Sequence, residues 1–391
     1  MNPFEKSAAL NRLPEQFFAQ LANNIQSHAQ KGHDVIDLGR GNPDTKTPDY
    51  IVKALQEAAE EPANHKYAPF RGFAYFKEAI AAFYKNEYNV DIDPETEVSV
   101  LFGSKTGLIH LSQCLLNPGD TALLPDPGYP DYETGIALAN AKMETFPLLE
   151  KNNFLPDYQT INPELLDKAK LMFLNYPNNP TAATADETTF DETVALANKH
   201  NFAVIHDFAY GAFGFDGEKP VSFLQSAGAK EVGVETYTLS KTYNMAGWRV
   251  GFALGNPSII EHINQLQDHM YASIFGAVQS AAAKALTTDQ QFVQELNEMY
   301  ENRRNAFIGE LHKIGWKVTP PPSTFFCWLP VPEGYTSETF AELLLTKAHV
   351  GVAPGNGFGD FGEGYVRIGL LDTEERLIEA AQRIGNLGIF S

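Results

Sequence analysis

The chain has 391 residues, of which 43% are hydrophobic and 12% aromatic, and its formal net charge is -20 at pH 7. This length suits two domains, and this apolar content excludes a chain that is disordered throughout. The acidic balance excludes a broad interface with the phosphates of a nucleic acid, although a local basic pocket can still bind a small anion.

The N-terminal ten residues, MNPFEKSAAL, lack the apolar central region of a secretory signal peptide. No apolar stretch approaches the roughly 18 residues that a membrane-spanning helix needs, so we expect no membrane partner. The two cysteines, Cys114 and Cys327, are too few for a disulfide framework or a zinc site. We therefore predict a cytoplasmic protein with reduced thiols.

Between about Tyr50 and Leu286, short apolar segments alternate with segments of helical character. This alternation is typical of a wound α/β sheet that is mostly parallel and covered by helices on both faces. The segments predicted to be strands are Val98–Phe102, Ala122–Pro125, Leu171–Asn175, Phe202–Asp207, Val234–Leu239 and Arg249–Leu254.

After about Thr287 the pattern changes. We predict a charged helix over residues 290–314, strands at FFCWLP and YVRIGLL, and a final helix from about Asp372. The segment before Pro48 is too short to fold alone, so we assign it to this C-terminal unit. The prediction is a large domain of residues 48–286 and a smaller, discontinuous α+β domain of residues 1–47 and 287–391. A cleft between two such domains is a frequent ligand site.

Polar residues follow several of the predicted strands, at the sheet edge where ligands of α/β proteins gather. A helix is predicted from Ser104, and its first backbone N–H groups can hold a phosphate. Asn179 follows the predicted strand Leu171–Asn175, Asp207 ends another strand with Tyr210 three residues on, and Lys241 ends a further one. One edge thus offers an anion cradle, an amide, a carboxylate, a phenol and an amine.

Pyridoxal 5'-phosphate is a cofactor that uses this whole set. It needs a lysine for its Schiff base and a carboxylate that keeps the pyridine nitrogen protonated. It also needs a hydrogen bond to its ring oxygen and a cradle for its phosphate. The residues at the strand ends therefore predict this cofactor.

The chain resembles the fold-type I, class I/II pyridoxal-phosphate aminotransferases over nearly its full length. The matching stretches occur in the order and spacing of that family. They are LGRGNPD, KYAPFRG, PDPGYPDY, NYPNNPT, HDFAY, SKTYNMAGWRVG and YVRIGL.

The resemblance implies roles for the residues around the cofactor ring. Lys241 would form the Schiff base, and Asp207 would pair with the pyridine nitrogen. Asn179 and Tyr210 would bind the ring oxygen, while Tyr129 would stack on the ring face. Lys241, Asp207 and Tyr210 are accordingly the expected catalytic residues.

The resemblance also implies how the cofactor phosphate is held. Ser104 and Lys105 would bind it through their backbone, together with Thr238 and Arg249. Tyr67 would reach the phosphate from a neighbouring subunit, which implies a homodimer with shared active sites.

For the substrate, the resemblance implies that Arg367 grips the carboxylate as a bidentate fork, a geometry that lysine cannot reproduce. Asn179 would assist, and Gly41 would let a loop pass close over the substrate. Lys105 has two interpretations. In some relatives this position helps to bind an acidic substrate side chain, and otherwise it only flanks the phosphate-binding loop. The stretch PSTFFCW departs from the family pattern near the expected substrate pocket.

The implied function is amino-group transfer between an L-amino acid and a 2-oxo acid in a ping-pong cycle, with Lys241 as general base. The pattern is most similar to bacterial methionine-salvage aminotransferases, which aminate 4-methylthio-2-oxobutanoate. An apolar pocket is expected from Phe17, Phe18, Phe326 and Trp328. The alternatives are an aromatic, alanine or aspartate aminotransferase, a C–S β-lyase of the same fold, and a regulator, which would need a further DNA-binding domain.

Two other patterns are interpreted as structural. The stretch GFGDFG, residues 357–362, fits a dinucleotide fingerprint, but a strand is predicted after it where the fingerprint requires a helix. His262 and His269 lie seven residues apart without further ligands at suitable spacing. We therefore expect no dinucleotide site and no metal site.

Overall fold

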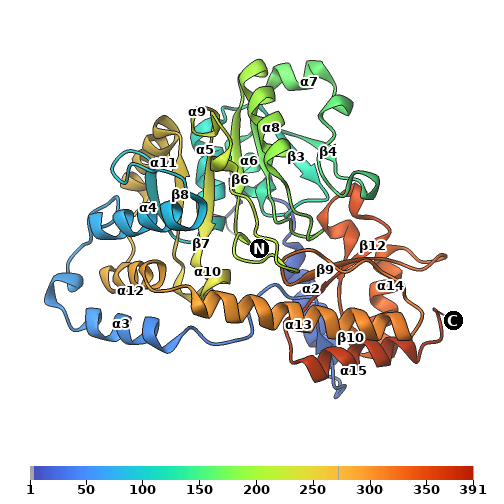
Figure 1. The fold of residues 1–391 in the computed structure, drawn as a ribbon. Coiled ribbons are helices and arrows are strands. Elements are labelled where there is room, and N and C mark those ends of the chain that lie inside the picture. The colour runs from blue at the N-terminus through green and yellow to red at the C-terminus, as the bar shows by residue number, and fades with distance from the viewer. Residues whose placement is uncertain (1–3, 272, 391) are drawn as a thin grey trace.

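The computed structural model describes residues 4–271 and 273–390, and its centre is a seven-stranded sheet of order β2-β8-β7-β6-β5-β3-β4 (Figure 1). Only β8 runs antiparallel to its neighbours, so the predicted mostly parallel α/β sheet is confirmed. The strands are β2 (Val98–Leu101), β3 (Thr121–Asp126), β4 (Lys142–Pro147), β5 (Ala169–Leu174), β6 (Ala203–Asp207), β7 (Gly233–Thr238) and β8 (Gly251–Gly255).

Helices cover both faces of the sheet, because the central strands are apolar on both sides. The first face packs against α5 (Ser104–Leu115), α6 (Tyr132–Ala139) and α11 (Pro257–Met270). The second face packs against α4 (Ala74–Tyr88), α8 (Glu187–His200), α9 (Ala229–Val232) and α12 (Gly276–Thr287), with α3 (Asp49–Ala59) against α12. Among the described residues, no helix combines the length and apolar character needed to cross a membrane.

Local sequence fixes where these helices begin and end. Asp186 precedes α8 and its carboxylate accepts a hydrogen bond from the backbone N–H of Thr189. Asn256 caps α11 in the same way, and Pro257 occupies the first helical position, where no N–H is needed. Asn201 ends α8 with φ of 55°, a left-handed conformation that asparagine tolerates. The chain then turns directly into β6.

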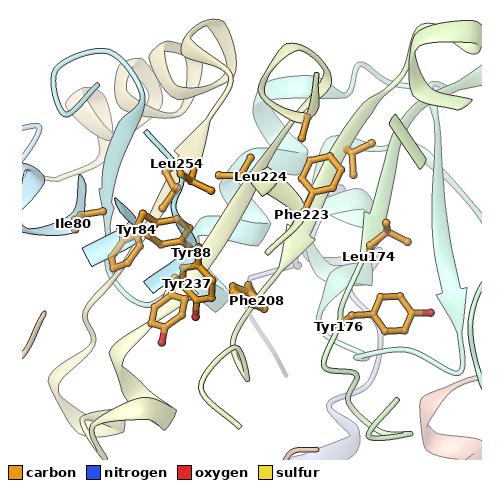
Figure 2. Packing of buried hydrophobic residues seen from close by; sticks show 14 of the residues in the cluster. Ile80, Tyr84, Tyr88, Leu174, Tyr176, Phe208, Phe223, Leu224, Tyr237 and Leu254 are labelled. Atoms are coloured by element: carbon orange, nitrogen blue, oxygen red, sulfur yellow. The ribbon is translucent and has the colours of Figure 1, made fainter. Parts of the chain in front are cut away.

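Aromatic packing fixes the ends of β6 and β7, where the predicted site residues lie. Figure 2 shows Tyr84 and Tyr88 of α4 beside Phe208 and Tyr237. The ring centroids of Tyr88 and Phe208 are 5.3 Å apart, and those of Tyr84 and Tyr237 are 6.2 Å apart. Both pairs are edge-to-face, a favoured geometry for aromatic rings. This cluster holds the two strands in register.

The C-terminal part packs around a second hydrophobic core, which also includes Ile36 and Leu38 from the N-terminal segment and the segment Ala209–Phe215 that follows β6. The strand β1 (Ile36–Asp37) pairs in parallel with β10 (Val350–Gly351), and α2 (Phe17–Ala29) lies among the C-terminal elements in Figure 1. The remaining elements are α1 (Ala8–Asn11), α7 (Pro163–Lys168), α10 (Leu239–Thr242), α13 (Gln291–Lys313), β9 (Phe326–Pro330), α14 (Ser337–Leu343), a π-helix (Leu344–Ala348), β11 (Ala353–Pro354), β12 (Tyr365–Gly369) and α15 (Glu374–Gly385).

Candidate active site

The carboxyl ends of the parallel strands open into a cavity of about 630 Å³ between the large sheet and the C-terminal part. The structure brings nearly all of the predicted site residues to this cavity. Those that line it are Gly41, Ser104, Lys105, Tyr129, Asn179, Asp207, Tyr210, Thr238, Lys241, Arg249 and Arg367.

Lys241 lies in α10, directly after β7, and its amine is half-buried at the cavity. The Nζ atom donates a hydrogen bond of 2.6 Å to the carbonyl oxygen of Gly41. Burial, followed by the nearby cations Arg367 and Arg249, lowers the pKa of Lys241 to about 8, while Asp207 opposes this shift. This amine is therefore easier to deprotonate than a solvated lysine.

Asp207 is the last residue of β6, and it is buried. The phenol of Tyr132 donates a hydrogen bond of 3.0 Å to its Oδ2 atom, and the backbone N–H of Ala209 donates to Oδ1 at 3.3 Å. Burial raises the pKa of Asp207 to about 6, although the bond from Tyr132 opposes that rise. In the described residues no cationic side chain hydrogen-bonds to this carboxylate, so the site favours a cationic N–H donor beside it.

The role of Tyr132 was missed by sequence reasoning. Its stretch, PDPGYPDY, was noted, but nothing in the local pattern shows that the phenol reaches Asp207 on a different strand. The link depends on how α6 packs against the sheet, where the ring of Tyr132 stacks on Phe173 with centroids 4.8 Å apart.

Arg367 lies in the centre of β12 and is only 1% exposed. Its Nη1 donates to Oδ1 of Asn179 at 2.8 Å, and its Nη2 donates to the carbonyl of Gly39 at 2.9 Å. The Nε atom is buried and has no hydrogen-bond partner among the described residues. Burial lowers the pKa of Arg367 to about 10. A buried guanidinium with an unused donor is suited to bind a carboxylate.

Asn179 is held by a second amide that sequence reasoning also missed. The backbone N–H of Asn179 donates to Oδ1 of Asn175 at 2.7 Å, and Nδ2 of Asn175 donates to the carbonyl of Asp207 at 2.7 Å. Asn175 thereby joins the end of β5 to the end of β6. The sequence did offer a signal for this role, because Asn175 is a polar residue at the end of an apolar predicted strand.

Two tyrosines form part of the aromatic wall of the cavity. Tyr210 is buried, and its ring packs edge-on against Phe325 and Phe326 at 5.5 and 5.6 Å between centroids. Tyr129 packs edge-on against Tyr132 at 5.4 Å. Both predicted tyrosines are thus fixed by neighbouring rings at the cavity.

One end of the cavity gathers groups that bind anions. The helix α5 begins at Ser104, after Gly103 with φ of 78°. A Cβ atom at Gly103 would lie 2.5 Å from Nη2 of Arg249, so only glycine lets this guanidinium approach the helix N-terminus. The hydroxyl of Thr238 donates to that of Ser240 at 2.9 Å. Ser240 also lines the cavity and was not predicted, although it directly precedes Lys241.

Arg249 itself differs from the expectation in its backbone. The predicted strand from Arg249 begins instead at Gly251, because Arg249 has a left-handed φ of 56°. Its Nη1 donates to the carbonyl of Ala246 at 2.8 Å. The turn points the side chain back toward α5 rather than along the sheet.

The amine of Lys105 is paired with a carboxylate of the same chain. It lies 2.8 Å from a carboxylate oxygen of Asp131, and the Lys105 side chain is 43% exposed. The backbone of Lys105 is in the first turn of α5, beside the anion-binding groups.

Tyr67 is the predicted cofactor-binding residue that does not line this cavity. It is 94% exposed on the surface of the single chain. Other exposed aromatic residues near it in sequence are Phe70 and Tyr75, at 56% and 40%. The position of Tyr67 leaves its side chain free for a partner.

The expected apolar pocket is only partly as predicted. Phe18 and Phe326 line the cavity, whereas Phe17 and Trp328 pack behind it against Phe358. Trp328 lies two residues from Phe326 in β9, and both it and Phe17 are taken up by edge-on packing against Phe358. The guanidinium carbon of Arg367 lies 4.2 Å from the ring centroid of Phe326 and 5.2 Å from that of Phe18.

The stretch GFGDFG serves the structure as expected. It forms two short 3₁₀ turns and precedes the strand β12. Backbone N–H groups of Asp360 and Phe361 donate to the carboxylate of Asp126 at 3.1 and 3.0 Å. These donors are therefore already occupied by a carboxylate from β3.

Comparisons with known proteins agree with this geometry. The sequence matches the family described as aminotransferase class I and II over residues 33–384. It is 61% identical over 388 residues to the L-glutamine–4-(methylsulfanyl)-2-oxobutanoate aminotransferase of Bacillus subtilis (strain 168), spanning 99% of this chain and 98% of the relative. Transaminase BacF of the same organism is 49% identical over 98% of this chain and 96% of BacF. The substrate-bound BacF structure covers 99% of both chains with a TM-score of 0.96 and 47% identity.

Proposed function

This chain belongs to the class I and II aminotransferases, and we propose that it transfers the amino group of L-glutamine to 4-(methylsulfanyl)-2-oxobutanoate, forming methionine. The main support for this proposal is a single cavity that is lined by Lys241, by the buried Arg367 and by the rings of Phe18 and Phe326. The similarity to a relative named for this reaction supports the choice of both substrates.

We propose pyridoxal 5'-phosphate as the cofactor, in line with the general use of this cofactor in the family. The buried carboxylate of Asp207, which has no cationic hydrogen-bond partner in the described residues, fits a protonated ring nitrogen. We assign Asn179 and Tyr210 to the ring oxygen and Tyr129 to the ring face, and all three line the cavity. Lys241 is the attachment point for the aldehyde. When bound, the cofactor supplies an electron sink for negative charge at the substrate α-carbon.

The anion-binding end of the cavity fits the cofactor phosphate. We assign to it the first backbone N–H groups of α5 at Ser104 and Lys105, the hydroxyl of Thr238 and the guanidinium of Arg249. To the predicted set we add the hydroxyl of Ser240, because it lies within hydrogen-bond distance of Thr238.

Lys241 acts as the general base in the proposed reaction. Its pKa of about 8 leaves a substantial fraction of the amine uncharged at mildly alkaline pH. The Nζ atom accepts the α-proton of the amino donor, and it returns a proton to the α-carbon of the acceptor in the reverse direction. Desolvation is what makes this lysine a usable base, because a solvated lysine remains protonated.

Arg367 binds the carboxylate that donor and acceptor share, and Gly41 gives the backbone room beside it. A Cβ atom at Gly41 would lie 3.3 Å from the ring of Phe326 and 3.9 Å from Nη2 of Arg367. Asn179 orients the guanidinium through its 2.8 Å hydrogen bond. Because one carboxylate site serves both substrates, the donor must leave as a 2-oxo acid before the acceptor binds, which gives ping-pong kinetics.

The wall around Arg367 supports a thioether side chain over a second carboxylate. Phe18 and Phe326 present apolar ring faces, and thioether sulfur packs favourably against aromatic rings. The amine of Lys105, which would otherwise suit an acidic side chain, is paired with Asp131. These features favour 4-(methylsulfanyl)-2-oxobutanoate over oxaloacetate.

We further propose that the chain is a cytoplasmic homodimer of two-domain subunits. The hydrophobic cluster of the C-terminal part supports the grouping of residues 1–47 with 287–391, because Ile36 and Leu38 belong to it, and the segment Ala209–Phe215 of the large domain packs into the same cluster. The 94% exposure of Tyr67 supports a second subunit, to whose active site this residue would contribute.

The proposed substrate is tested by a panel of acceptors with L-glutamine as the donor. We expect kcat/KM to be highest for 4-(methylsulfanyl)-2-oxobutanoate and far lower for oxaloacetate, pyruvate and phenylpyruvate. The matched control is 2-oxohexanoate, which has a similar length without the sulfur. If oxaloacetate ranks well above the methylsulfanyl acceptor, the substrate assignment is wrong. Release of pyruvate and ammonia from a cysteine thioether without any acceptor would instead indicate a β-lyase.

A further inference from the structure

Three histidines, two of them close in sequence and the third more than three hundred residues away, meet at the C-terminal end of α2. His28 is in the last turn of α2, His33 follows the next turn, and His349 ends the π-helix Leu344–Ala348. One ring nitrogen from each lies within 4.8 Å of the others. Nε2 of His28 and Nδ1 of His349 are 3.0 Å apart.

The backbone fixes this arrangement. Gly32 has φ of 93°, which lets the chain reverse after α2 and lays the His33 ring over both other rings. Its centroid lies 4.4 Å from that of His28 and 4.4 Å from that of His349. The backbone N–H of Ile36 donates to the carbonyl of His349 at 2.9 Å, at the start of the pairing of β1 with β10. The cluster is therefore built on paired strands as well as on a helix end.

The surroundings leave the imidazole nitrogens without an anionic partner. Among the described residues no carboxylate hydrogen-bonds to any of the three rings, unlike His200 and His206, which each contact one. The adjacent carboxylate of Asp34 is already bound by the guanidinium groups of α15. Nε2 of His28 and Nδ1 of His349 share a hydrogen bond with each other, and imidazole nitrogens are common ligands of transition-metal ions.

We propose that His28, His33 and His349 form a binding site for a divalent transition-metal ion, with Zn²⁺ as the principal candidate. Imidazole nitrogens bind Zn²⁺ at about 2.0–2.1 Å, which places the ligand nitrogens of a tetrahedral site roughly 3.4 Å apart. Binding would require the rings to rotate out of their stacked arrangement, and the exposed side chain of His33 is the one least enclosed by the fold. Three protein ligands leave the fourth position for water.

The site would connect the C-terminal end of α2 to β10. The same helix carries Phe18, Leu21 and Ile25, which line the cavity at its other end. A bound ion would thus hold the helix that forms one wall of the cavity against the strand pair β1–β10. This inference is independent of the proposed substrate.

The test is calorimetric titration of Zn²⁺ into holoenzyme that was purified without a polyhistidine tag, treated with a chelator and kept in phosphate-free buffer. We expect one Zn²⁺ ion per chain, and a loss of affinity of roughly tenfold or more in His33→Ala and in His349→Ala. The double variant His262→Ala/His269→Ala is the matched control, because those histidines lie on α11 outside the cluster. It should bind Zn²⁺ as the wild type does.

A second measurement separates ligation from a change in folding. Co²⁺ in place of Zn²⁺ should give visible absorption bands in the wild type and in the control variant, and these bands should be lost in His33→Ala. His33 is exposed, so this variant should keep the wild-type melting temperature without metal. If Zn²⁺ does not bind at one ion per chain, or if His33→Ala and His349→Ala bind it with wild-type affinity, the proposed site is wrong.

Discussion

At the scale of single residues, the cavity depends on ionisable groups that are held away from water. Lys241 and Arg367 have lowered pKa values and Asp207 has a raised one, and burial is the largest cause in each case. Each group is thus less stable in its charged form than it would be in water. A cofactor and a substrate of complementary charge would relieve this cost, which is a common feature of active sites.

Asp207→Asn should have opposite effects on the stability of the cofactor-free protein, which it should raise, and on aminotransferase activity, which it should abolish. The folded-state pKa of about 6 lies above the ordinary 3.8, so the contribution of Asp207 to stability is greatest below pH 4 and is lost as the pH rises through 6. The variant should therefore have a higher Tm than the wild type when both are cofactor-free at pH 8. The corresponding gain in free energy of unfolding is at most about 3 kcal/mol. At pH 4 it should change Tm little.

The same variant should lose aminotransferase activity, because a neutral amide cannot keep a ring nitrogen protonated. Asp191→Asn, on the exposed side of α8, is the control and should alter neither property. A lower Tm of Asp207→Asn at pH 8 would contradict the assignment of a strained, buried charge.

At the scale of elements, the exposed carboxylate of Asp34 ties α15 to the connection between α2 and β1. Its oxygens lie 2.9 Å from Nη2 of Arg376 and 2.5 Å from Nη2 of Arg383. Nη1 of Arg383 also donates to the backbone carbonyl of Asp34 at 2.6 Å. These contacts, with the hydrogen bond from Arg376 first, lower the pKa of Asp34 to about 2.

Asp34→Asn should lower Tm at neutral pH and have a smaller effect in acid. The folded-state pKa is below the ordinary value, so the stabilisation is present above about pH 4 and is lost as the pH falls toward 2. Thermal unfolding of wild type and variant between pH 7 and pH 3 should show the two curves converging. The effect should be modest, since exposed ion pairs contribute little and salt screens them. Asp49→Asn, which removes a single exposed pair with Lys46, serves as control.

The elements themselves were largely predictable. The helix expected over residues 290–314 is α13, and all six strands predicted between residues 98 and 254 are present, with ends displaced by at most two residues. The strand β4 was missed, because its first four residues are exposed and its sequence, KMETFP, lacks the apolar run of the buried strands. The two-residue strands β1 and β10 were missed because so short a segment has no period to detect.

At the scale of the whole molecule, Tyr67 requires a second subunit if it contributes to an active site. Its side chain is 94% exposed and does not line the cavity of its own chain. Exposed aromatic residues such as Phe275, at 45%, are also consistent with a surface that another chain covers. Mixing of variant chains in solution can test the proposed homodimer.

Two inactive variants should restore activity when their chains are mixed. Lys241→Ala removes the general base, and Tyr67→Ala removes the proposed contact to the cofactor phosphate in the active site of the partner subunit. After unfolding and refolding together, about half of the dimers would be mixed, and each would hold one intact site, so about a quarter of wild-type sites should be recovered. The readout is turnover relative to each variant refolded alone. If mixing restores nothing while Tyr67→Ala alone has little activity, Tyr67 acts within its own chain or outside the site.

The sequence by itself determined which residues end the strands of the large sheet. The carboxyl ends of parallel strands lie at one edge of the sheet. Recognition of the strands was therefore enough to predict that Asn179, Asp207 and Lys241 lie close together. The resemblance to a known family extended this reasoning to Arg367, which lies on a different sheet.

Only the tertiary structure decided the contacts between segments that no short-range pattern connects. It showed that Tyr132 donates to Asp207, and that Phe18 rather than Phe17 faces the cavity. It also brought His28 beside His349 across more than three hundred residues of sequence. The physical reason is that local pattern fixes which face of an element is buried, whereas the packing of one element on another fixes which side chains touch.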